Sequence, residues 1–257
     1  MFKRIRVAIL LFILASVALG TWKSQSRTRS WESTLYVSVF PINADGSEAS
    51  ARHIAALEES SFEAVEEYLD AQAREHGLAQ TRPVMVSLGP RIERVPPPRP
   101  RTSSALDAIR WSLTIRYWAW VNTPATAPKP DIRLYALYYD PAAHPVMPES
   151  TGLQKGQIGL AHLFAEKKMH GSNLVILTHE MLHTLGATDL YDLRTTLPRY
   201  PDGYARPRQS PLYPQPLAEL MAGRIPLSKT QADIPRSLGE TVIGARTASV
   251  IGWLRDE

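Results

Sequence analysis

The stretch from Leu177 to Asp192, "LTHEMLHTLGATDLYD", holds two histidines four residues apart, with a glutamate directly after the first. Residues i and i+4 share one face of a helix, so His179 and His183 are expected to direct both imidazoles at one metal ion. Glu180 lies about 100° around the helix axis from His179, where its carboxylate can reach a metal-bound water without being a ligand. The pattern predicts a helix that carries a hydrolytic metal site.

The residues after this helix suggest a third ligand. Glycine is the usual residue where a helix ends in a left-handed turn, so the chain can bend at Gly186 and return Asp189 to the metal. Two histidines and one carboxylate leave a fourth position open for water, as a catalytic zinc site requires. Alternatively, Asp189 caps the next turn, and Asp192, Tyr191 or a distant histidine completes the site.

This stretch resembles the metzincin superfamily of zinc peptidases. The motif of that family is H-E-x-x-H-x-x-G-x-x-H or, in a minority such as the snapalysin-like enzymes, the same pattern with a final Asp. The family also has a methionine-bearing turn beneath the metal, which "LAELMAG" around Met221 resembles, although Met221 could also be an ordinary core residue. The matching positions here are His179, Glu180, His183, Gly186 and Asp189.

The resemblance implies a zinc-dependent endopeptidase with Zn²⁺ as cofactor and a peptide or protein as substrate. Zinc would acidify its water and polarise the scissile carbonyl, while Glu180 passes the proton to the leaving amine. It also implies an α/β (α+β) fold of the matrixin-like kind: a twisted mixed sheet, a long active-site helix and a C-terminal helical subdomain. Two family features are missing, because Gly223 stands where some metzincins have a tyrosine and the chain has no cysteine.

Composition narrows the class of protein. The chain has 257 residues and is 44% apolar, which is enough for one catalytic domain over residues 31–257. The absence of cysteine excludes disulfides and thiolate zinc ligands. The net charge is +4, and Lys3, Arg4 and Arg6 supply three of those charges, so the remainder carries about +1. No nucleic-acid partner is therefore expected.

The first 30 residues are expected to direct export. "MFKRIRVAILLFILASVALGTWK" (residues 1–23) has a basic start, an apolar run from Val7 to Leu19, and small residues at Ala18 and Gly20. That layout is typical of a secretory signal peptide. Extended to Trp22, the apolar run nearly reaches the length of a membrane anchor, so cleavage and N-terminal membrane association both remain open. In either case we expect the main domain to lie outside the cytoplasm.

Periodicity and turn residues place the remaining elements. The expected strands are residues 34–42, 83–89, 131–140 and 156–164, and the expected helices are residues 51–78, 104–121 and 240–254. The last of the four strands is also our candidate for an open edge that pairs with substrate. The proline-rich "RVPPPRPR" between the second strand and the second helix is expected to be an extended surface connector rather than a protein-binding motif.

Other functional interpretations stay open. Trp111, Tyr117, Trp118 and Trp120 could form a ligand platform, but packing in a largely buried helix is the favoured interpretation. His162 and His170 lack metal-ligand spacing, which favours surface or core roles. The alternative functions are a catalytically silent zinc-binding domain and an envelope-anchored interaction domain. The presence of Glu180 argues against a purely structural zinc site, which gains nothing from a base.

Overall fold

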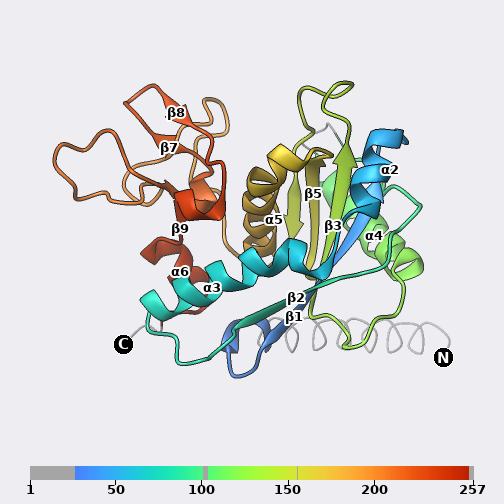
Figure 1. The fold of residues 1–257 in the computed structure, drawn as a ribbon. Coiled ribbons are helices and arrows are strands. Elements are labelled where there is room, and N and C mark those ends of the chain that lie inside the picture. Colours follow the sequence, from blue (N-terminus) through green and yellow to red (C-terminus); the bar gives the residue numbers. More distant parts are fainter. Residues whose placement is uncertain (1–26, 101–103, 155, 255–257) are drawn as a thin grey trace, which may run out of the picture.

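The computed structural model describes residues 27–100, 104–154 and 156–254, so residues 1–26 of the predicted export segment lie outside the described residues. A five-stranded sheet with the order β2-β1-β3-β5-β4 forms its centre (Figure 1). Four strands are parallel, and β4 pairs antiparallel to β5. The strands are β1 (Leu35–Asn43), β2 (Val84–Leu88), β3 (Ile132–Tyr139), β4 (Thr151–Leu153) and β5 (Ile158–Phe164). This confirms the predicted mixed α/β (α+β) class.

The two faces of the sheet are covered differently. Along β3, Leu134 and Ala136 belong to one core cluster and Tyr135 and Leu137 to the other, because successive side chains point to opposite faces. One face packs against α2 (Glu48–Ala55), α3 (Glu63–Glu75), α5 (His170–Thr184) and α6 (Ala245–Ile251). Of the described helices, α4 (Ala105–Asn122) alone packs on the other face.

The prediction of one continuous helix over residues 51–78 is wrong, because the helix is interrupted. The chain leaves α2 after Ala55 and restarts with the 3₁₀ helix η1 (Glu59–Phe62), which leads directly into α3. The restart has a local cause: the backbone N–H of Glu58 donates to the Ser61 hydroxyl at 3.0 Å, and the Glu58 side chain accepts in return. This reciprocal capping begins a new helix where the apolar periodicity suggested continuity.

The prediction that α4 is largely buried is also wrong. Trp111 and Trp118 pack against the sheet and are 9% exposed, as expected for core residues. Tyr117 and Trp120 are 66% and 74% exposed, because no described residue covers the outer side of the helix. No helix of the described ranges is long and apolar enough to cross a membrane.

The edge of the sheet beside α5 is not the predicted one. β5 is paired with β3 on one side and with β4 on the other, so the edge strand there is the three-residue β4. A side chain at Gly152 in β4 would lie 2.3 Å from the Cβ of His183 and 2.6 Å from the carbonyl oxygen of Glu180. Only glycine therefore allows β4 to approach α5 this closely.

Between α5 and α6 the chain is mostly irregular, and it covers the side of α5 that faces away from the sheet. Met221, Ala222 and Leu238 from this segment join the same core cluster as Leu182 of α5. The helix predicted over residues 240–254 is present as α6 but is shorter, because it begins only at Ala245 and ends at Ile251. The short elements of this segment are β6 (Ala218–Glu219), η3 (Leu220–Ala222), β7 (Ile225–Pro226), β8 (Ala232–Asp233), η4 (Leu238–Glu240) and β9 (Thr241–Val242); η2 (Lys167–Met169) directly precedes α5.

Candidate metal centre

Helix α5 carries the centre and is held firmly in place. Nine of its fifteen residues are buried, so it has little freedom to shift between the sheet and the C-terminal segment. Near its start, the Asn173 side chain accepts from the backbone N–H of Phe164 at 3.1 Å and donates to the carbonyl of the same residue at 2.8 Å. This exchange ties the end of β5 to the helix that carries the histidines.

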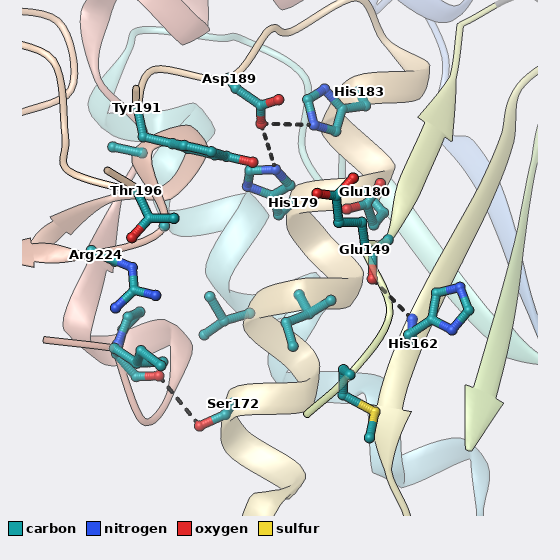
Figure 2. Close-up of a pocket in the computed structure, with 18 of the residues that line it drawn as sticks. Glu149, His162, Ser172, His179, Glu180, His183, Asp189, Tyr191, Thr196 and Arg224 are labelled. Atoms are coloured by element: carbon teal, nitrogen blue, oxygen red, sulfur yellow. Dashed lines mark hydrogen bonds and ion pairs between the residues drawn. The ribbon is translucent and has the colours of Figure 1, made fainter. Parts of the chain in front are cut away.

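The end of α5 has the geometry that the sequence predicts. Gly186 adopts a φ of +103°, in the left-handed region that favours glycine. The N–H of Ala187 donates to the carbonyl of Leu182 and the N–H of Gly186 to that of His183, both at 3.1 Å. This pair of bonds is the Schellman pattern of a glycine-terminated helix. The turn reverses the chain and brings Asp189 back to the histidines (Figure 2).

Backbone carbonyls fix the orientation of both imidazoles. His179 donates its Nδ1–H to the carbonyl of Leu220 at 3.0 Å, and His183 donates its Nδ1–H to the carbonyl of Ala187 at 2.8 Å. Because a carbonyl oxygen can only accept, Nδ1 must carry the proton in both rings. In a neutral imidazole the Nε2 atom then presents a lone pair, which is the form that binds a metal.

The two Nε2 atoms face the same carboxylate oxygen. Oδ1 of Asp189 lies 3.1 Å from Nε2 of His179 and 3.2 Å from Nε2 of His183 (Figure 2). Ligands about 2.0 to 2.1 Å from a tetrahedral zinc are themselves about 3.3 Å apart, which is close to both distances. Three lone-pair atoms this close repel one another unless a cation, either a proton or a metal ion, lies among them. The spacing of the donor atoms therefore fits a tetrahedrally bound metal ion.

Glu180 completes the cluster from inside the protein. The ligand-capable atoms of His179, Glu180 and His183 all lie within 4.8 Å of one another, so these three residues are positioned to bind a metal ion. Glu180 is 4% exposed, and its Oε2 has no hydrogen-bond partner among the described residues. Burial raises the pKa of Glu180 although both histidines oppose the shift. A buried, unpartnered carboxylate oxygen is costly unless a ligand or water meets it.

The electrostatics also favour positive charge at this point. Burial alone would lower the pKa of His179, but the hydrogen bond to Asp189 and the charge of Glu180 outweigh it and raise that pKa to about 9. The pKa of Asp189 lies well below its ordinary value: burial opposes this shift, but the hydrogen bonds from His179 and His183 outweigh it. Without a metal ion the cluster therefore retains a proton, and a bound metal would replace that proton.

Behind the histidines lies the turn that contains Met221, which is completely buried in the core. Its conformation is set by Glu219, a fully buried carboxylate that sequence reasoning missed. One oxygen of Glu219 accepts from the N–H groups of Met221 at 2.7 Å and Ala222 at 3.1 Å. The other accepts from the N–H of Gly244 at 3.1 Å and the hydroxyl of Thr247 at 2.6 Å. Glu219 thus holds the segment whose Leu220 carbonyl orients His179.

A cavity of about 610 Å³ opens beside the cluster and is lined by residues from α5, from the segment before β4 and from the C-terminal segment. Tyr191 lines it, with its ring directed towards His179 (Figure 2). Burial, together with the charges of Asp189 and Glu180, raises the pKa of Tyr191 to about 12, so its hydroxyl stays a donor at neutral pH. Sequence reasoning considered Tyr191 only as a possible ligand.

The remaining predicted candidates lie outside the cluster. The Asp192 carboxylate accepts from the N–H groups of Arg194 and Thr195 at 2.9 and 3.0 Å, so it supports the loop. A ring nitrogen of His170 bonds to the carbonyl of Ser61, away from the site. His162 lines the cavity, but its Nδ1 pairs with the hydroxyl of Tyr139 at 3.0 Å.

No protein-family model matches the chain, and no curated protein matches it. The mixed fold and the cluster of His179, Glu180 and His183 on a long helix are compatible with the H-E-x-x-H pattern.

Proposed function

We propose that the chain is a zinc-dependent endopeptidase. In this proposal His179, His183 and Asp189 hold the ion, and Glu180 is the catalytic base. The observation that carries the proposal is the convergence of two Nε2 atoms and one carboxylate oxygen at 3.1 and 3.2 Å, with the unpartnered Glu180 oxygen beside them. We assign the third position to Asp189 rather than Glu180, because the Asp189 distances match those between zinc ligands.

Each side chain has a separate part in hydrolysis. Zinc, when bound, supplies Lewis acidity that lowers the pKa of water and polarises a carbonyl. Glu180 accepts a proton from the attacking water while the oxygen of that water forms a bond to the carbonyl carbon. Glu180 then delivers that proton to the amine nitrogen as the C–N bond breaks. The hydroxyl of Tyr191 donates a hydrogen bond to the carbonyl oxygen, where negative charge develops.

The edge strand β4 offers a way to hold the substrate. Glu149 and Ser150, directly before β4, line the cavity, and Gly152 brings β4 against α5 beside His183. An extended peptide that pairs with the outer edge of β4 would therefore lie along the cavity. This pairing needs only main-chain groups, which suits a peptide or protein substrate, and cavity side chains such as Arg99 and Arg224 would determine preference.

The proposal is tested with the Glu180→Ala variant. Because Glu180 moves protons and does not hold the ion, zinc content should stay near that of the wild type while peptide hydrolysis falls by about 10² to 10⁴-fold. Tyr191→Phe, which removes only a hydroxyl, should keep zinc and lower kcat by about 10². The measurements are zinc content by mass spectrometry and cleavage of a peptide library.

Three outcomes would contradict the proposal. Unchanged hydrolysis in Glu180→Ala would remove Glu180 as the base, and loss of zinc from that variant would show that Glu180 is a ligand. Stoichiometric zinc in a wild-type protein that cleaves no peptide would favour the second candidate, a catalytically silent zinc-binding domain. The unpartnered oxygen of Glu180 argues against this candidate, because a structural site has no use for a buried base.

The predicted export segment leads us to propose that the domain works outside the cytoplasm. Cleavage near Ala18 and Gly20, or retention of the segment as an anchor, would be distinguished by the mass of the mature protein.

A further inference from the structure

Helix α4 exposes an unusual amount of apolar surface. Of the thirteen large apolar side chains that are exposed in the described ranges, six lie on this one helix. At 100° per residue these six side chains fall within about 120° of arc, which makes a continuous stripe. The stripe consists of Leu106, Ile109, Leu113, Tyr117, Trp120 and Val121, which are 50 to 74% exposed. A stripe of this kind marks an interaction surface.

The surroundings of the stripe are basic. α4 carries Arg110 and Arg116, and the extended segment of residues 89–98 carries two more arginines. That segment lies against α4, since the indole N–H of Trp111 donates to the carbonyl of Pro97 at 3.0 Å. The two segments hold four arginines and two acidic residues, a balance of +2. Arginines beside leucines and a tryptophan are typical of helices that lie in the interface of an anionic bilayer.

The path of the chain also points to a membrane. Arg27, the first described residue, pairs with Asp131 at 2.8 Å, and Asp131 ends the connection between α4 and β3. The apolar stretch that ends at Trp22 lies five residues before Arg27, and five residues span at most about 18 Å. If the segment is retained as an anchor, it enters the domain at Arg27, beside the connection that follows the aromatic end of α4.

We propose that the exposed stripe of α4 lies in the interface of an anionic phospholipid membrane and orients the domain on it. The apolar side chains enter the boundary between headgroups and acyl chains, Tyr117 and Trp120 lie at headgroup level, and the arginines meet lipid phosphates. α5 lies on the opposite face of the sheet from α4 (Figure 1), so in this orientation the metal centre would face away from the lipid. If the site cleaves peptides as proposed above, its substrates are segments outside the bilayer.

The experiment uses the full chain, reconstituted in vesicles of phosphatidylcholine with about a third phosphatidylglycerol. The natural sequence has no cysteine, so one introduced cysteine gives a unique site for an environment-sensitive fluorophore. Labels at Leu113→Cys and Trp120→Cys should emit as in an apolar medium and be quenched by nitroxide-bearing lipids. Labels at Val146→Cys, 82% exposed in a loop, and at Leu193→Cys, 76% exposed at the cavity, should remain in water and unquenched.

A matched pair of variants checks the stripe itself. In a chain labelled at Tyr117→Cys, the double change Leu113→Gln and Trp120→Gln should lower lipid quenching about tenfold, because two apolar anchors are lost while glutamine maintains the helix. The single change Val146→Gln should leave quenching unaltered.

Every other outcome overturns the proposal. Labels on α4 that remain in water in vesicle-bound protein would show that the stripe does not meet lipid. Labels that are dry but not quenched by lipid would assign the stripe to another protein surface: residues 1–26 if the signal is independent of concentration, or a second copy if it is not. Quenching at Leu193 equal to that at Trp120 would contradict the orientation of the metal centre.

Discussion

Helices α5 and α4 lie on opposite faces of one sheet and are both rich in apolar residues, yet they differ in how much of each is covered. Nine of the fifteen residues of α5 are buried, and four of the eighteen residues of α4 are. The sheet packs on one side of α5 and the C-terminal segment on the other, whereas only the sheet side of α4 is covered among the described residues. Because α5 is covered on both sides, its side chains are fixed in the positions that a metal centre needs. Because α4 is covered on one side only, its other side remains available for the proposed contact with a membrane.

The largest effect is expected at the third proposed ligand, on the enclosed side. Asp189→Ala should weaken zinc binding by more than the ~10 to 100-fold typical of a lost supporting residue, because it removes a ligand. Asp189→His should restore part of this loss. Asp192→Ala is the matched control: its carboxylate is exposed and only caps the loop, so zinc affinity should change little. Zinc titration of the three variants tests whether Asp189 is the third ligand. Loss of zinc from Asp192→Ala alone would refute this assignment.

A smaller loss of zinc affinity should follow from weakening the hydrogen bonds that hold the C-terminal segment against α5. Glu219→Gln replaces one accepting oxygen with an amide that faces N–H donors, and this should cost about 3 to 5 kcal/mol of stability. It should also weaken zinc binding, because the Leu220 carbonyl would no longer hold His179. Thr247→Val removes one donor to the same carboxylate and should cost about 1 kcal/mol. Denaturant unfolding and zinc titration measure both. Equal costs for the two variants would mean that Glu219 is not the centre of this network.

The two sides of α4 can be compared directly within one helix. Ile115 is fully buried against the sheet, and Leu113, two residues earlier, is 58% exposed. Ile115→Ala should cost about 3 kcal/mol through lost packing, whereas Leu113→Ala should change stability by about 0.5 kcal/mol or less. Both free energies of unfolding should be measured without lipid. A large cost at Leu113 would show that another part of the protein covers the stripe.

The smallest expected effect is the dependence of stability on pH. Burial lowers the pKa of His162, beside the cavity, from 6.5 to about 4. Between these values the unfolded chain binds a proton that the folded chain does not, so stability falls as the pH falls from about 6.5 to about 4. Because His162 is partly exposed, we expect this loss to reach about 2 kcal/mol. The measurement compares zinc-free wild type with His162→Gln, in which this part of the loss should disappear. If stability fell equally with pH in the wild type and in His162→Gln, His162 would not be the cause of the loss.

The sequence was informative wherever local rules apply. The spacing of His179 and His183 and the glycine at position 186 predicted one helix face and a left-handed end, because both depend on residues within two turns. The parallel strands were visible as β-branched and aromatic runs. The break before η1 depends on a capping pair, Glu58 and Ser61, that apolar periodicity does not detect.

The rest depends on contacts between distant parts of the chain. β4 has three residues, too few for a periodic pattern, and exists because β5 and α5 lie beside it. Glu219 is a single acidic residue in an apolar stretch of sequence. Its structural role depends on hydrogen bonds from Gly244 and Thr247, which are distant in the sequence. The aromatic residues of α4 were expected to be buried, because composition shows that a helix is apolar but not which of its sides is covered.

In the proposed site His179, His183 and Asp189 hold zinc, and Glu180 remains free to act as base. X-ray absorption at the zinc edge identifies the ligands of the ion and should be measured on the purified wild-type chain and on Glu180→Ala. We predict one zinc per chain in both proteins, with two imidazole nitrogens and carboxylate or water oxygens at about 2.0 to 2.1 Å. A wild-type protein without stoichiometric zinc would refute the proposed metal site, and loss of an oxygen ligand in Glu180→Ala would show that Glu180 binds the ion.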